Sequence, residues 1–299
     1  MIAPLHLSGN TTERQNKLLQ EFLSEAVQQA YRAAIEQLDR QHAEYVLEAS
    51  AKLKAEIATA VVEMIQCYTA SDRYKDEEVG SNRVYPDNYR VRPIESQVAE
   101  LIKIFPSLGR CQEKLGRLDL PEGAEGWLAI PRWQDLAATY NEAVEMALAA
   151  LTAKRRFANR IAGRLGPEYL RQHERTVLAE KILAEQQQGS DILVIALQAG
   201  MVHRGCSARR TREAMVGNEF GLGVFAIVCL LLTHPERLST TETLMIDCGG
   251  DEYSLRGDRT FDRVPLFDYD MSGIEFSIFY DDRCRSLWGT PTGFLFKVI

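Results

Sequence analysis

ILVIAL, residues 192–197, is an unbroken apolar run that follows the turn-forming pair Gly189 and Ser190. A continuous apolar run of this length, preceded by turn residues, predicts a strand that is buried on both faces. After Leu238, turn-forming Gly, Asp, Ser and Pro separate four more predicted strands, at 244–247, 267–269, 274–279 and 293–299. The apolar–polar alternation of 274–279 indicates an antiparallel strand with one buried face.

Helices are predicted around these strands. Apolar residues recur at helical spacing in 133–157, a second helix is expected at 168–187, and an apolar helix at 218–233. A short strand is expected at 127–131, where Pro131 ends it. This order of elements predicts an α+β fold, with a mixed or antiparallel sheet and packed helices, in a module over residues 126–299.

The N-terminal region is predicted to be helical over residues 1–80. Between Thr12 and Val79 the chain has no Gly or Pro, and apolar residues recur at helical spacing. One helix of about 60 residues would be roughly 90 Å long, and would need an oligomeric coiled coil or a partner to cover it. A helical hairpin bent near residues 39–42 would need neither. In both versions we expect self-association or a protein partner to use residues 12–70.

Residues 81–125 are predicted to be a linker that contains one short helix. Pro86 and Pro93 interrupt the first part of this segment, and a helix from 94 to about 105 ends before Pro106. A further loop with Pro121 leads into the predicted strand at 127–131.

A basic segment, HRGCSARRTR at residues 203–212, follows the predicted strand at 192–197. Guanidinium groups and hydroxyl donors are the side chains that bind phosphate. If the strand is parallel to its neighbours, this segment lies where open sheets bind ligands. The alternative is a solvated helix face whose arginines pair with acidic residues elsewhere. The candidate phosphate- or nucleic-acid-binding residues are His203, Arg204, Ser207, Arg209, Arg210 and Arg212.

An acidic Gly-Gly turn, DCGGDEY at residues 247–253, is expected at the end of another strand. The carboxylates of Asp247, Asp251 and Glu252 are oxygen ligands of the kind that a hard cation such as Mg²⁺ prefers. The spacing matches no EF-hand loop. The alternative, which we favour, is a structural turn whose acidic side chains cap backbone amides and pair with arginines.

Composition and charge narrow the classes of function. With 45% hydrophobic and 26% charged residues, the chain has the balance of a globular protein. The net charge of -7 provides no overall attraction to nucleic acid or to anionic membrane, so any polyanion binding must be local. The six cysteines form no CxxC pair, and the only G-x-G, at 221–223, lacks a third glycine and a preceding strand. We therefore expect a cytoplasmic protein with no cofactor and no membrane partner.

Several motifs together resemble an uncharacterised group of bacterial, phage or mobile-element proteins. The motifs are GWLAIPRW at 126–133, HRGCSARRTR at 203–212, GNEFGLG at 217–223, LLTHPERL at 231–238 and DCGGDEY at 247–253. The resemblance covers about residues 126–299 and implies no activity, cofactor or catalytic residue. In that group the position of Cys206 is usually basic, which argues against Cys206 as a nucleophile.

The leading functional hypothesis is a non-enzymatic interaction or accessory protein of bacterial or mobile-element origin. Its helical region would bind protein, and residues 203–212 would contact nucleic acid. The first alternative is an enzyme that acts on a phosphate-containing substrate with the arginines and the acidic Gly-Gly loop. The second is a structural component of a phage or another assembly.

Overall fold

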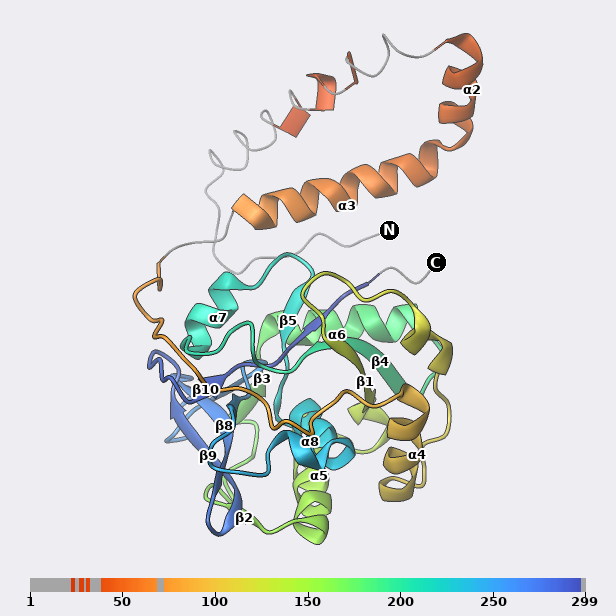
Figure 1. Ribbon diagram of the computed structural model, residues 1–299. Coiled ribbons are helices and arrows are strands. Elements are labelled where there is room, and N and C mark those ends of the chain that lie inside the picture. Colours follow the sequence, from red (N-terminus) through yellow and green to blue (C-terminus); the bar gives the residue numbers. More distant parts are fainter. Residues whose placement is uncertain (1–22, 25–26, 30, 33–38, 69–72, 297–299) are drawn as a thin grey trace. The chain divides into compact units, whose positions relative to one another are not determined.

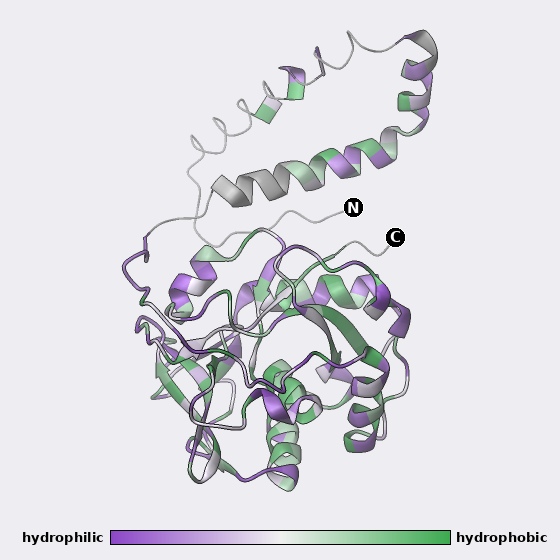
Figure 2. Cartoon of the chain, viewed as in Figure 1, coloured by the Kyte–Doolittle hydropathy of each residue, from purple (hydrophilic) through white to green (hydrophobic). Residues whose placement is uncertain are grey.

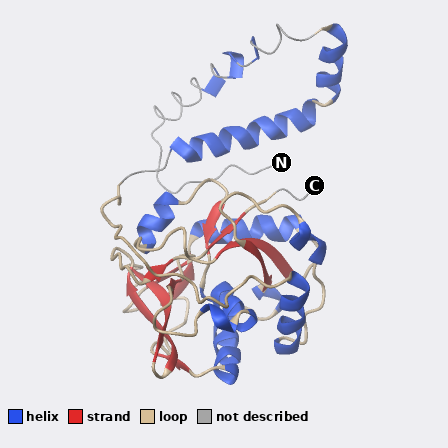
Figure 3. Cartoon of the chain, viewed as in Figure 1, coloured by secondary structure: helices blue, strands red, loops and turns tan. Residues whose placement is uncertain are grey.

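The fold was obtained as a computed structural model, which describes residues 23–24, 27–29, 31–32, 39–68 and 73–296 (Figure 1). The chain divides into two compact units, an N-terminal unit of residues 1–62 and a C-terminal unit of residues 63–299. All strands of the described residues belong to the C-terminal unit (Figure 3).

The N-terminal region is not the long helical region that the sequence predicts. Its continuous described stretch, residues 39–68, forms two short helices, α2 (Arg40–Glu48) and α3 (Ser50–Tyr68), while residues 1–22, 25–26, 30, 33–38 and 69–72 of the predicted helical region lie outside the described part. Asp39 starts α2, because its carboxylate accepts a hydrogen bond from the His42 backbone N–H at 2.8 Å. Ala49 leaves the helical conformation (φ -84°, ψ 8°) and separates the two helices. The predicted fold class was wrong on this point, because an Ala-rich stretch without Gly or Pro gives no signal for such a break.

The C-terminal unit is α+β and rich in sheet. A four-stranded sheet has the order β1-β4-β11-β5, and every neighbouring pair is antiparallel. Its strand β4 contains the apolar run, is buried at all seven positions, and is hydrophobic along its length in Figure 2. The strands are β1 (Gly126–Pro131), β4 (Ile192–Gln198), β5 (Glu219–Gly221) and β11 (Thr292–Phe294).

A second sheet, of seven strands, carries the acidic turn. Its order is β10-β6-β8-β7-β3, and β9 pairs with both β8 and β2. The β8–β9 hairpin turns at Gly273, whose φ of 125° favours glycine. The strands are β2 (Phe157–Asn159), β3 (Leu170–Gln172), β6 (Met245–Asp247), β7 (Asp251–Tyr253), β8 (Arg263–Asp270), β9 (Gly273–Tyr280) and β10 (Trp288–Gly289).

Helices complete the core of the C-terminal unit. All ten residues of α8 are buried, and α8 packs against α5, α4 and β1, while α6 packs against β4 and β5. Residues 81–125 include α4, whose Ile94, Val98 and Leu101 are part of this core. The helices are α4 (Ile94–Ile104), α5 (Tyr140–Lys154), α6 (Glu174–Gln186), α7 (Ala208–Ala214) and α8 (Val224–Thr233), with short 3-10 helices η1 (Glu113–Arg117), η2 (Trp133–Asp135) and η3 (Pro235–Arg237).

Within the described ranges, no helix combines the length and the apolar character that crossing a membrane requires.

Candidate functional site

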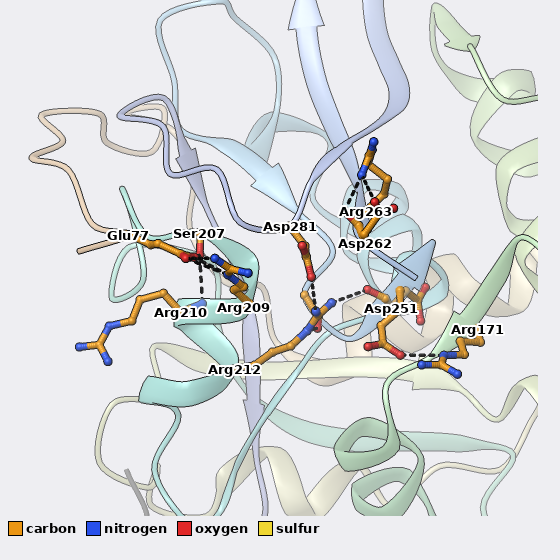
Figure 4. Close-up of polar contacts among 12 residues, drawn as sticks. Glu77, Arg171, Ser207, Arg209, Arg210, Arg212, Asp251, Asp262, Arg263 and Asp281 are labelled. Atoms are coloured by element: carbon orange, nitrogen blue, oxygen red, sulfur yellow. Dashed lines mark hydrogen bonds and ion pairs between the residues drawn. The ribbon is translucent and has the colours of Figure 1, made fainter. Parts of the chain in front are cut away.

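The basic segment begins helix α7 and is held by acidic residues. Ser207 is the N-cap of α7: its hydroxyl accepts from the Arg210 backbone N–H at 3.0 Å and donates to the Glu77 carboxylate at 2.6 Å. Arg209 donates from Nε to both oxygens of Glu77 at 2.8 Å (Figure 4), and its guanidinium lies 4.4 Å from the centre of the Tyr74 ring. Burial raises the pKa of Glu77, but the hydrogen bonds from Arg209 and Ser207 outweigh it and bring the pKa below its usual value.

Two further cations of the basic segment, Arg210 and Arg204, are also engaged. Arg210 forms ion pairs with Glu78 and, at 3.0 Å, with Glu213, and only 12% of its side chain is exposed. Arg204 donates to the Arg83 carbonyl at 3.3 Å, and no ion pair of Arg204 is found among the described residues. The cationic charge predicted for phosphate binding is therefore largely neutralised within the chain.

His203 is buried in the interior, whereas the arginines of the segment are partly exposed. Its Nε2 is 2.7 Å from a carboxylate oxygen of Glu219, which also accepts from the Thr292 hydroxyl at 2.5 Å. Both side chains are less than a tenth exposed. Burial raises the pKa of Glu219, and the His203 contact more than offsets this, so the pKa lies below its usual value. His203 is therefore a hydrogen-bonding partner of Glu219 inside the core.

Arg212 joins the basic segment to the acidic Gly-Gly turn. It donates from Nε to the Gly249 carbonyl at 3.0 Å and from Nη2 to the Asp251 carbonyl at 2.7 Å. Its Nη1 is 3.7 Å from the Asp281 carboxylate (Figure 4). The two loops predicted from the sequence therefore meet, but the contact uses one buried arginine and two backbone carbonyls.

The three carboxylates of the turn have different partners. Asp251 is buried and accepts at 2.7 Å from both the Tyr140 hydroxyl and the Val224 backbone N–H. Because Val224 is the first residue of α8, the Asp251 carboxylate caps the start of that helix. Glu252 pairs with Arg171 at 2.7 Å (Figure 4), and Asp247 is buried at the end of β6. Across the described part of the chain, no group of three or more His, Cys, Asp or Glu side chains is placed to hold a metal ion.

Burial changes the protonation of two of these acids. It raises the pKa of Asp247 to about 7, with Arg285 and Arg212 acting in the opposite direction. It also raises the pKa of Asp251 to about 7, although the Val224 N–H and the Tyr140 hydroxyl favour the charged form. One oxygen of Asp251 has no hydrogen-bond partner among the described residues. Both acids therefore take up or release protons near neutral pH inside the core.

The glycines of two motifs allow two chain segments to touch. A Cβ added to Gly221 would lie 2.6 Å from the Gly250 nitrogen, and one on Gly223 would lie 2.5 Å from the Asp251 carboxylate. The Gly250 N–H donates to the Leu222 carbonyl at 3.0 Å. Close packing of backbone on backbone thus accounts for Gly221 and Gly250, and the Asp251 side chain leaves no room for a Cβ at Gly223.

Sequence reasoning missed a pocket in the C-terminal unit, between the end of β1 and helix α6. It has a volume of about 550 Å³, and Arg132, Trp133, Gln172 and Glu180 are among its lining residues. Gln172 donates to the Glu180 carboxylate at 2.9 Å, and burial raises the pKa of Glu180 to about 7. These residues come from three separate segments, so no spacing in the sequence connects them. Among these four lining residues, only Arg132 and Trp133 belong to a motif that the sequence singles out, GWLAIPRW.

The N-terminal unit presents apolar side chains on its surface. Exposed fractions are 59% for Tyr45 and 71% for Leu47 in α2, and 40% for Leu53 and 42% for Ile57 in α3. Figure 2 shows hydrophobic and hydrophilic residues alternating along the first part of α3. No protein-family model, no curated protein and no solved structure matches the chain.

Proposed function

We propose that the protein is a non-enzymatic interaction protein that self-associates through one face of α3. The observation that carries this proposal is the exposure of Leu53 and Ile57, which are four residues apart and so lie on the same side of the helix. Neighbouring exposed apolar side chains are typical of protein–protein contact sites. Burying a fully exposed side chain of this kind contributes about 1.5–3 kcal/mol, and because only 40% of Leu53 and 42% of Ile57 is exposed, each contributes about 0.6–1.2 kcal/mol to association.

The charges beside this face favour a second copy of the chain as the partner. Lys52 and Glu56 carry opposite charges, are exposed, and are also four residues apart. In an antiparallel pair of α3 helices centred on residue 54, Lys52 of each copy would lie opposite Glu56 of the other. Each α3 thus supplies both the apolar face and the complementary charges for its own partner.

The phosphate-directed alternatives have less support. A phosphate-binding enzyme or a nucleic-acid interface at residues 203–212 requires cations that are available to the ligand. Arg209 and Arg210 are each paired with glutamate, and Arg212 is buried against backbone carbonyls. A polyanion would have to replace these intramolecular contacts before it gained any of its own.

Light scattering on the full chain tests the proposal with two matched double variants. Leu53→Asp/Ile57→Asp places two charges on the apolar face and is expected to convert a dimer into a monomer. Ala51→Asp/Ala55→Asp adds the same charges at the same spacing on exposed positions of the same helix, about 160–200° around it, and should remain dimeric. A monomeric wild type, or equal dissociation of both variants, would refute the proposal.

A second measurement separates this proposal from its nucleic-acid alternative. Fluorescently labelled duplex DNA is titrated at about 50 mM and about 200 mM salt, because phosphate contacts weaken steeply with salt. The self-association proposal predicts no salt-dependent binding. Binding that falls with salt and is lost in Arg209→Ala/Arg210→Ala would instead assign the function to residues 203–212.

A further inference from the structure

The pocket between the end of β1 and α6 has an apolar floor and a polar wall. Ile130, Pro131 and Leu193 are buried and line it from the sheet, and Ala184 lines it from α6. Its volume of about 550 Å³ lies within the range of small-molecule sites. The floor offers an aliphatic surface, while Glu180, Gln172, Trp133 and Arg132 form the wall.

Among the described residues Glu180 has no ion pair, although Lys181 also lines the pocket. Its carboxylate accepts from Gln172, and the nearby Trp133 indole N–H favours its charged form without reaching hydrogen-bonding geometry. No ion pair of Glu180 occurs among the described residues, and no cation is among the groups that stabilise its charge. A positively charged ligand group would supply a cation beside Glu180 and stabilise its carboxylate.

Two donors in the same wall have unused hydrogen-bonding capacity. Trp133 Nε1 and Arg132 Nε are buried, and neither has a hydrogen-bond partner in the part of the chain that the structure describes. The guanidinium of Arg132 is 30% exposed and reaches a carboxylate, that of Asp135, only at 3.6 Å. Buried donors without hydrogen-bond partners destabilise a fold, so we expect each of these two donors to bind an acceptor of a ligand.

The wall is rigid enough to be a preformed site. The Trp133 ring packs edge-to-face on Tyr140, with ring centroids 5.9 Å apart, and the Tyr140 hydroxyl donates to buried Asp251 at 2.7 Å. The pocket is thereby anchored to the Gly-Gly turn and to the start of α8. Side chains held in this way bind a ligand with little loss of conformational entropy.

We propose that this pocket binds a free α-amino acid with an aliphatic side chain. Its ammonium group contacts Glu180, its carboxylate accepts from Arg132 and Trp133, and its side chain packs on Ile130 and Leu193. A zwitterion is the small ligand that matches an unpaired acid and unused donors on one wall above an apolar floor. The site is separate from α3 and stands independently of self-association.

Calorimetric titration of the full chain with three ligands of matched shape tests this assignment. L-leucine carries both charges, 3-methylbutylamine lacks the carboxylate, and 4-methylpentanoate lacks the ammonium group. Loss of either charged contact is expected to weaken binding at least about tenfold relative to leucine. No heat of binding for leucine up to about 10 mM, or equal affinities for the three ligands, would overturn the proposal.

Two variants of α6 then test the role of Glu180. Glu180→Gln keeps the shape of the side chain and is expected to weaken leucine at least about tenfold while leaving 4-methylpentanoate unchanged. Glu185→Gln removes the same charge at an exposed lining position one to two turns away and should change leucine binding less than about twofold. Equal effects of both variants on leucine, or equal loss of both ligands in Glu180→Gln, would refute a contact between Glu180 and the ammonium group.

Discussion

Replacing Asp251 with Asn should change how the stability of the C-terminal unit depends on pH. Burial raises the pKa of Asp251 to about 7, whereas an aspartate in the unfolded chain has a pKa of about 3.9. Between these values the folded state holds a proton that the unfolded state has released. The stabilisation is therefore complete below about pH 4 and is lost as the pH rises through 7.

The size of the effect follows from the two pKa values. From about pH 6 to pH 8, proton linkage lowers the free energy of unfolding by about 1.3 kcal/mol for this one group. In Asp251→Asn the amide side chain stays neutral at every pH and can still accept from Tyr140 and Val224. The free energy of unfolding of the variant should therefore not show this decrease of about 1.3 kcal/mol. Asp247, whose pKa burial also raises to about 7, contributes its own decrease in both proteins.

Thermal unfolding followed by circular dichroism at pH 6 and pH 8 measures this difference. On going from pH 6 to pH 8, the Tm of Asp251→Asn should rise by about 3–5 °C relative to the Tm of the wild type. Asp119→Asn removes the same formal charge from an exposed position and serves as the control. A gap that is the same at both pH values would refute the raised pKa of Asp251.

Three further predictions concern the core. Arg237→Met removes a fully buried guanidinium that donates to two backbone carbonyls and should lower Tm by roughly 6–12 °C; an unchanged Tm would contradict these contacts. Gly250→Ala places a Cβ 2.5 Å from the Gly223 nitrogen and should prevent native folding, whereas Gly109→Ala, with open space around it, should leave Tm within about 2 °C. Burial raises the pKa of the Cys248 thiol, so iodoacetamide should label it only after unfolding, as peptide mass spectrometry can check.

Two strands of the C-terminal unit were predictable from their hydrophobic pattern, whereas the longer helical pattern of the N-terminal region was misleading. The apolar run at 192–197 is β4, and the alternating segment at 274–279 is the central part of β9. Short strands such as β5 and β7 have three residues each and no pattern of their own. They exist because a neighbouring strand pairs with them, which is a property of the folded chain.

The candidate site was predictable in its residue types but not in its partners. Arginines beside hydroxyl groups indicate phosphate binding, yet Glu77 and Glu78, more than a hundred residues earlier, neutralise Arg209 and Arg210. The prediction also depended on a parallel strand before this segment, and β4 is antiparallel to both of its neighbours. Neither fact can be derived from spacing along the chain, because both depend on contacts between distant segments.

The sequence by itself determined which segments had to be buried, since apolar runs and periodicity reflect how water excludes side chains. The apolar run at 192–197 and the helix at 224–233 belong to this part. The tertiary structure alone decided that Arg212 joins the basic segment to the acidic turn, and that Trp133 and Glu180 share a pocket. Charge pairing and hydrogen bonding depend on distances in space, and a sequence does not specify distances between residues that lie far apart along it.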